Sequence, residues 1–165
     1  LSIAFPNYRM FYKYRSNLQG IWTVLKIDPA ILWEKECAFC LENAASSRVR
    51  GIPIEVRRKP ESLRALFRDY HGPEMLVRRE DLGLPDHFPT HPQAEVLVFD
   101  TIEAMWITEI CLETPDHLKT LETINDNCGR SIPILAERDF YRPRKDYKFW
   151  REPLRQTSEE EMIPF

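Results

Sequence analysis

The sequence predicts an α+β fold built from short strands and short helices. Apolar residues make up 43% of the 165 residues and aromatic residues 12%, which suits a folded core. Thirteen prolines against five glycines predict many rigid turns and argue against a long helical bundle. A chain of this length usually forms one domain, so we expect residues 1–165 to fold as a unit.

The first part of the chain predicts a short helix, a strand and a capped turn. The aromatic segment at residues 8–15 is compatible with a short helix. The β-branched run at residues 21–28 predicts a strand that stops at the pair Asp28-Pro29. Because Asp caps helices and Pro favours their first turn, the same pair also predicts a short helix through Trp33.

The middle of the chain predicts one helix and one long connection. The segment "CAFCLENAASS" predicts a strand or a turn that ends near Asn43. Residues 61–70 predict a helix with its apolar side chains on one face: Leu63, Leu66, Phe67 and Tyr70. Residues 71–92 contain four prolines and two glycines, and few apolar residues that could anchor this segment in a core. We therefore expect this connection to be functional and to become ordered when substrate binds.

The last part of the chain predicts three strands and one helix. The apolar run at residues 95–100 and the run "MWITEICL" each predict a strand, the first of them buried. Residues 114–126 predict a capped helix, and residues 131–141 predict the last strand.

A glutamate at the start of the buried strand needs an explanation. Since strand side chains alternate, we expect Glu95 on the same face as Leu97 and Phe99. A carboxylate among apolar side chains is costly unless a partner or a function offsets the cost. Glu95 is therefore either a functional carboxylate or the partner of a cation, and the local pattern leaves both interpretations open.

The net charge of −3 conceals a segregation of charge along the chain. Residues 1–27 carry four basic residues and no acidic one, and residues 48–80 carry nine basic residues against five acidic ones. Residues 95–128 carry eight acidic residues and one basic one. Such segregation predicts a basic face that binds a polyanion, although ordinary surface charge gives a similar pattern.

Cysteine spacing and missing motifs narrow the function classes. Cys37 and Cys40 form a CxxC pair without a second pair at metal spacing, so we expect buried thiols and no metal site. The GxSxG, P-loop, GxGxxG and HExxH motifs are absent. No apolar run approaches the ~20 residues of a membrane span and no export signal is visible, which predicts a cytoplasmic protein without a membrane partner. The start at Leu1 suggests missing upstream sequence.

Four segments occur in an order that resembles a known family. "FPNYRMFYKYR", "ENAAS", "QAEVLVFD" and "IPILAERDFY" are similar to the motifs of the DarT family of NAD-dependent DNA ADP-ribosyltransferase toxins. The resemblance spans most of residues 3–141, and "QAEVLV" is its most specific piece. It implies a mixed central β-sheet of the ADP-ribosyltransferase type with flanking short helices. It also implies transfer of ADP-ribose from NAD onto a nucleobase of single-stranded DNA, by a bacterial toxin that has an antitoxin partner.

The same resemblance implies candidate site residues. The family's catalytic glutamate lies in the motif matched by "QAEVLV", which corresponds to Glu95. Where thymidine-modifying members place an arginine, this chain has Asn7, and the nearest arginine, Arg9, is the second catalytic candidate. A family segment that binds the nicotinamide end of NAD has no match here. The NAD-binding candidates are Asn7, Tyr8, Arg9, Tyr12 and Asn43, and the substrate-loop candidates in residues 70–92 are Arg78, Arg79, His87 and His91.

A single carboxylate can suffice for such a transfer. Cleavage of the nicotinamide–ribose bond generates an oxocarbenium-like centre, and nicotinamide leaves as a neutral molecule without a general acid. A glutamate can bind a ribose hydroxyl, favour the cationic transition state and accept the proton of the attacking base nitrogen. Two alternatives remain. One is a non-catalytic nucleic-acid-binding or protein-interaction module in which Glu95 pairs with a core arginine, and the other is a transferase of this fold that modifies protein.

Overall fold

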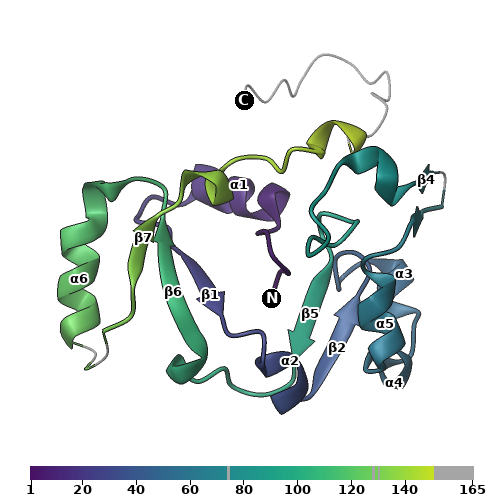
Figure 1. The fold of residues 1–165 in the computed structure, drawn as a ribbon, viewed down its shortest axis with the longest axis horizontal. Helices are drawn as coiled ribbons and strands as arrows, with labels where there is room; N and C mark the ends of the chain where they lie inside the picture. The colour runs from purple at the N-terminus through teal and green to yellow at the C-terminus, as the bar shows by residue number, and fades with distance from the viewer. Residues whose placement is uncertain (74, 128, 130, 151–165) are drawn as a thin grey trace.

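The computed structural model of the protein describes residues 1–73, 75–127, 129 and 131–150. Short helices, short strands and 3₁₀ turns make up this part, which confirms the α+β class. The expected single central sheet is not seen there. The described strands form a three-stranded sheet, a two-stranded sheet and a small hairpin. Figure 1 shows the two larger sheets on opposite sides of the N-terminal segment.

The three-stranded sheet consists of β1 (Val24–Ile27), β6 (Ile107–Leu112) and β7 (Ile134–Ala136), with β6 in the middle. β1 is antiparallel to β6 and β7 is parallel to it, so this sheet is mixed. A parallel neighbour requires a crossover connection, and α6 (Leu118–Asn127) supplies it between β6 and β7. The predicted last strand is shorter than expected, because the chain after Ala136 turns into a 3₁₀ segment.

The two-stranded sheet positions the candidate glutamate. β2 (Cys37–Cys40) pairs with β5 (Glu95–Val98) in antiparallel register, so that Cys40 lies opposite Glu95. On the other edge of β5, Ser2 forms an antiparallel bridge to Glu95. The backbone at the first residue of β5 is therefore held from both sides.

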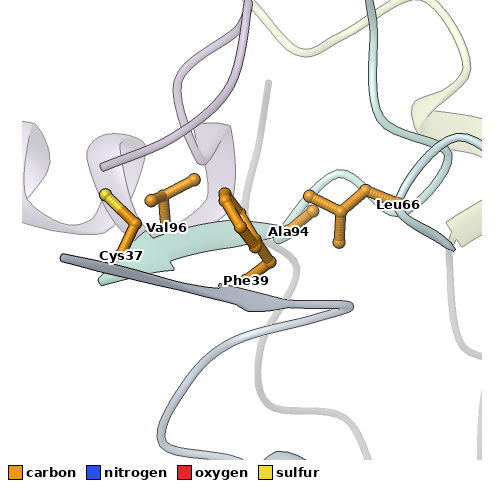
Figure 2. Close-up of a cluster of buried hydrophobic side chains, with 5 residues drawn as sticks. All are labelled: Cys37, Phe39, Leu66, Ala94 and Val96. Carbon is orange, nitrogen blue, oxygen red and sulfur yellow. The ribbon is translucent and has the colours of Figure 1, made fainter. Parts of the chain in front are cut away.

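The main core cluster lies on one face of this small sheet, as Figure 2 shows. It consists of Cys37, Phe39, Leu66, Ala94 and Val96. Glu95 shares its face with Leu97, as expected, but strand side chains alternate and the cluster takes the face of Val96. The face of Glu95 is also buried where it meets β2, because Cys40, opposite Glu95, and Ala38, opposite Leu97, are each 0% exposed.

The predicted short helices are present at residues 8–17 and 31–34. α1 (Tyr8–Asn17) begins after Asn7, whose Oδ1 accepts a hydrogen bond of 3.3 Å from the backbone N–H three residues on. α2 (Ile31–Glu34) begins later than predicted, because its N-cap is Ala30, which has no side-chain cap, and not Asp28. Asp28 instead accepts a hydrogen bond of 2.9 Å through Oδ1 from the N–H of Ala30 in the preceding turn. Asn7 satisfies a donor that the first turn of α1 leaves without a partner.

The remaining helices are short and lie beside the two-stranded sheet (Figure 1). They are α3 (Ser47–Arg50), α4 (Ile54–Arg57) and α5 (Pro60–Ala65). The helix predicted to reach residue 70 ends earlier, because β3 (Tyr70–His71) pairs with β4 (Leu76–Val77). None of the described helices has the length and the apolar character needed to cross a bilayer.

The connection at residues 71–92 is better anchored than its composition suggests. It contains β4 and a 3₁₀ turn, and it buries Val77 and Leu82 in a second cluster with Tyr70 and Trp150. The expectation of few anchors is wrong because the principal anchor, Trp150, comes from far downstream in the chain.

The prediction of buried thiols is confirmed for the three cysteines that the structure describes. Cys37, Cys40 and Cys111 are free and buried, and burial raises the pKa of each thiol. Buried protonated thiols of this kind behave as small apolar side chains. Cys128 lies outside the described residues.

Candidate active site

Glu95 is half-buried and carries one hydrogen bond from the backbone. Its Oε2 accepts a hydrogen bond of 2.9 Å from the N–H of Ala44, in the turn that follows β2. Within the described residues no ion pair joins its carboxylate to a lysine, arginine or histidine. The alternative in which Glu95 pairs with a core arginine therefore finds no support in this part of the chain.

The turn after β2 is shaped by the side chain of Asn43. Its Oδ1 accepts a hydrogen bond of 2.8 Å from the N–H of Ala45, and its carbonyl oxygen accepts one of 2.9 Å from the N–H of Ser46. These bonds leave the N–H of Ala44 directed at the Glu95 carboxylate. The structure thus brings two predicted site residues, Asn43 and Glu95, into one unit.

A second acidic residue, Glu42, stands at the start of the same turn, and sequence analysis missed it. The Tyr70 hydroxyl donates to its Oε2, and Arg48 lies 3.1 Å from the same oxygen. Arg48 also donates to the Tyr70 hydroxyl at 2.8 Å and to the carbonyl oxygen of His71 at 2.7 Å. The position of Glu42 inside the "ENAAS" motif was the available signal.

In this cluster the carboxylate of Glu42 stays ionised and the hydroxyl of Tyr70 stays protonated. Burial alone would raise the pKa of Glu42, but hydrogen bonds from Tyr70 and Ser46 and the charge of Arg48 outweigh burial and lower it. Burial, followed by the hydrogen bond to Glu42, raises the pKa of Tyr70 to about 12. The cluster therefore places an ionised carboxylate, paired with Arg48, close to the turn that holds Glu95.

His91 lies four residues before Glu95, between two aromatic rings. Its ring centroid is 4.6 Å from that of Tyr70 and 4.7 Å from that of Trp150. The backbone N–H of Gln93 donates to Nδ1 at 3.1 Å, so the ring proton of the neutral form is on Nε2. Burial lowers the pKa of His91 to about 4.

The two arginines predicted to contact DNA differ in their surroundings. Arg78 is exposed, and among the described residues its ion pair is a long one of 3.8 Å with Glu80. The guanidinium of Arg79 instead donates to oxygens within its own connection: the carbonyls of Pro85, Asp86 and Phe88 and the hydroxyl of Thr90. Arg79 therefore holds the connection together, and Arg78 is the one whose charge faces solvent.

The candidates on α1 diverge instead of forming one group. Asn7 is 2% exposed and lines a cavity of about 600 Å³. Tyr12 lines a different cavity of about 470 Å³, and Tyr8 is half-buried. Arg9 donates through Nη2 to the carbonyl oxygen of Trp150. The structure does not bring Tyr12 to Asn7.

The cavity beside Asn7 is within the size range of small-molecule sites. Its lining is mainly apolar and includes Val96 and, at its edge, His87. The Nδ2 of Asn7 is buried and makes no hydrogen bond within the described residues. Buried amide donors are normally paired, so this atom is available to a ligand. The backbone N–H of Asn7 donates to Ser2 at 3.1 Å, which connects Asn7 to the neighbour of Glu95 on the edge of β5.

A further acidic group on the three-stranded sheet has a structural explanation. The ligand atoms of Glu109, Cys111 and Glu137 lie within 4.8 Å of one another. The ammonium group of Lys26 lies 2.7 Å from Glu109 and 3.0 Å from Glu137, and its pKa is raised by its hydrogen bonds to these carboxylates. The ion pairs with Lys26 therefore account for the position of these two carboxylates.

Comparison with known proteins is consistent with this geometry. A model of a family described as DarT, ssDNA thymidine ADP-ribosyltransferase, matches residues 4–142. A search of curated proteins found no match. The matched range contains the Glu95 strand, the turn at Asn43 and α1. ADP-ribosyltransferases of this kind take ADP-ribose from NAD and act as toxins. Because the match covers most of the chain, this protein belongs to the DarT family, whose members ADP-ribosylate thymidine in single-stranded DNA.

Proposed function

We propose that Glu95 is the catalytic carboxylate with which this chain transfers ADP-ribose from NAD to thymidine. The observation that carries the proposal is the position of the carboxylate at the first residue of β5, held through Oε2 by the N–H of Ala44. Its other oxygen, Oε1, makes no hydrogen bond within the described residues and is left to act on substrate. A pre-positioned carboxylate of this kind suits a transfer that needs no general acid.

The proposed reaction exchanges one C–N bond for another. The bond between the ribose C1′ of NAD and nicotinamide breaks, and nicotinamide leaves with the electron pair as a neutral molecule. Glu95 stabilises the positive charge that develops on the ribose by binding one of its hydroxyls. A ring nitrogen of the thymine base attacks C1′, and Glu95 accepts the proton that this nitrogen loses.

Binding of NAD is proposed for the residues that flank Glu95. The turn at Asn43 lies on one side of the carboxylate and Asn7, through Ser2, on the other. The unpaired Nδ2 of Asn7 supports a role as donor to NAD. Arg9 remains a proposed second catalytic residue, with its guanidinium anchored at Trp150. Tyr12 is proposed from the family resemblance and lines the other cavity.

We expect the substrate DNA to lie along the connection at residues 71–92, next to the candidate glutamate. We also expect the protein to act in the cytoplasm, where its DNA substrate is accessible, and to have a protein antitoxin as partner, as the toxin activity of the family implies.

Mass spectrometry of the reaction products tests the proposed substrate. We expect incubation with NAD to add one ADP-ribose to a single-stranded oligonucleotide that contains thymidine. A matched oligonucleotide with every thymidine replaced by deoxycytidine should stay unmodified. Labelling of protein in the same mixture, with the oligonucleotides unchanged, would instead indicate the protein-modifying alternative.

Charge reversal at Arg78 should weaken binding of DNA in a salt-dependent manner. The side chain is 63% exposed, so an Arg78→Glu variant changes charge without breaking buried contacts. We expect the slope of log affinity against log salt concentration to fall by about one for a lost phosphate contact. Arg64→Glu is the matched control, because Arg64 is 66% exposed and lies on α5. Equal slopes for the Arg78 variant and wild type would remove this connection from the DNA surface.

A further inference from the structure

The C-terminal strap, defined as residues 143–150, lies beyond the range that the family model matches. Figure 1 shows this part of the chain crossing from the side of β7 to the connection that follows β4. There the buried guanidinium of Arg144 donates to the carbonyl oxygens of Pro89 at 2.7 Å and Thr90 at 2.6 Å. It also donates through Nε, at 2.6 Å, to Asp146. The strap thus binds the backbone immediately before His91.

The end of the strap reaches the imidazole itself. Trp150 packs edge-on against His91, with 4.7 Å between the ring centroids, and its Nε1 donates to Asp146 at 2.7 Å. Arg144 and Trp150 therefore share one carboxylate acceptor, and both are less than 10% exposed. Together they fix the backbone and the ring of a residue four positions before Glu95.

We propose that the C-terminal strap is a working part of the DNA site, in which Arg144 and Trp150 are positioning residues that hold His91 so that its Nε2–H donates to a carbonyl oxygen of the thymine base. The proposal rests on the proposed function, because it assumes that the base is presented to Glu95. It adds a specificity-determining residue and two supporting residues outside the matched range.

The geometry favours a carbonyl acceptor over a phosphate. The N–H of Gln93 donates to Nδ1, which requires that nitrogen to be unprotonated, so the ring is neutral. A phosphate contact would favour the imidazolium form instead. At position 4 thymine presents a carbonyl oxygen, O4, whereas cytosine presents an amino donor. Both pyrimidines carry O2, so the proposed acceptor for His91 is O4. A neutral donor held in place thus distinguishes the two pyrimidines.

Charged groups from every neighbouring element bear on this protonation state. They are Glu42 in the turn after β2, Arg9 on α1, Arg48 on α3 and Arg144 in the strap. Glu42 favours the protonated imidazole and the three arginines disfavour it, with burial as the largest influence. Removal of the Trp150 ring reduces that burial, so the pKa of His91 should rise from about 4 toward its ordinary value of 6.5.

A Trp150→Leu variant of the full chain tests the proposal. We expect the ratio of base modification to hydrolysis of NAD to fall at least tenfold, with the loss in KM for a thymidine oligonucleotide rather than for NAD. The loss should deepen as the pH falls from 7 to 5, because protonation of Nδ1 breaks the hydrogen bond from the N–H of Gln93 that orients the ring, although Nε2 keeps its proton. Trp150→Phe keeps a ring beside His91 and should restore much of the ratio. Trp33→Leu, at a 70% exposed tryptophan on α2, is the matched control.

Nuclear magnetic resonance of the His91 ring separates this inference from the catalytic proposal, because it needs no turnover. In wild type the imidazole should stay neutral, with its proton on Nε2, from pH 7 to 5, and in Trp150→Leu it should titrate in that range. A wild-type ring that titrates near its ordinary value overturns the inference, whatever the role of Glu95. So does a Trp150→Leu variant with the wild-type KM and pH profile, or one that loses base modification and NAD hydrolysis equally.

Discussion

Replacing Glu95 with glutamine should reduce base modification by about 10²–10⁴-fold, the range expected when a general base is lost. Glutamine has nearly the same size, and its amide oxygen can still accept the N–H of Ala44, so the turn should keep its conformation. The variant lacks the negative charge that stabilises the ribose cation and the group that accepts the proton of the base. We therefore expect a folded protein that has lost its chemistry.

The measurement is the initial rate of ADP-ribose addition to a thymidine oligonucleotide, with thermal unfolding as the check on folding. Glu61→Gln is the matched control, because this glutamate is 71% exposed on α5 and its ion pair, with Arg64, is exposed as well. The control should retain the wild-type rate. A Glu95→Gln rate within a few-fold of wild type would show that Glu95 is a structural residue and that another group is catalytic.

Replacing Arg144 with alanine should reduce the free energy of unfolding by roughly 3–5 kcal/mol, the cost of leaving a buried carboxylate without its cation. Arg144 and Asp146 are each 2% exposed, and the guanidinium also donates to two backbone carbonyls. The variant removes the hydrogen bonds that Arg144 donates to Asp146 and to the carbonyl oxygens of Pro89 and Thr90, and these acceptors stay buried. Within the described part of the chain, the Trp150 Nε1–H would remain as a donor to Asp146.

Denaturant unfolding followed by circular dichroism measures this effect. Lys145→Ala is the matched control, because its side chain is exposed between the same two buried residues, and it should change stability by less than about 0.5 kcal/mol. Equal unfolding free energies for both variants would show that the strap contributes little to the fold. The Trp150 variants described above probe its role in the DNA site separately.

Local sequence signals located the catalytic candidate but not its surroundings. The "QAEVLV" and "ENAAS" motifs identified Glu95 and Asn43, and the structure joins them through the N–H of Ala44. The helix at α1 and the turn at Asp28 were also predicted, because a cap is made by side chains and backbone within a few residues.

Residues that are distant in the chain could not be grouped in this way. The Tyr70 hydroxyl meets Glu42 across 28 positions, and Arg144 meets Thr90 across 54. Neither pairing leaves a periodic pattern, because periodicity reports only which side chains share a face of one element. For the same reason the connection at residues 71–92 was expected to lack anchors, although Trp150 supplies one.

The sequence by itself determined the composition of the elements and the family to which the motifs belong. Tertiary structure alone decided that the main core cluster lies on the Val96 face of β5, where Phe39 and Leu66 belong to the same cluster. It also decided that Arg79 binds its own connection while Arg78 faces solvent, although the two are neighbours in the sequence. The physical reason is that burial and hydrogen-bond partners depend on the position of the whole chain, which no local run of residues specifies.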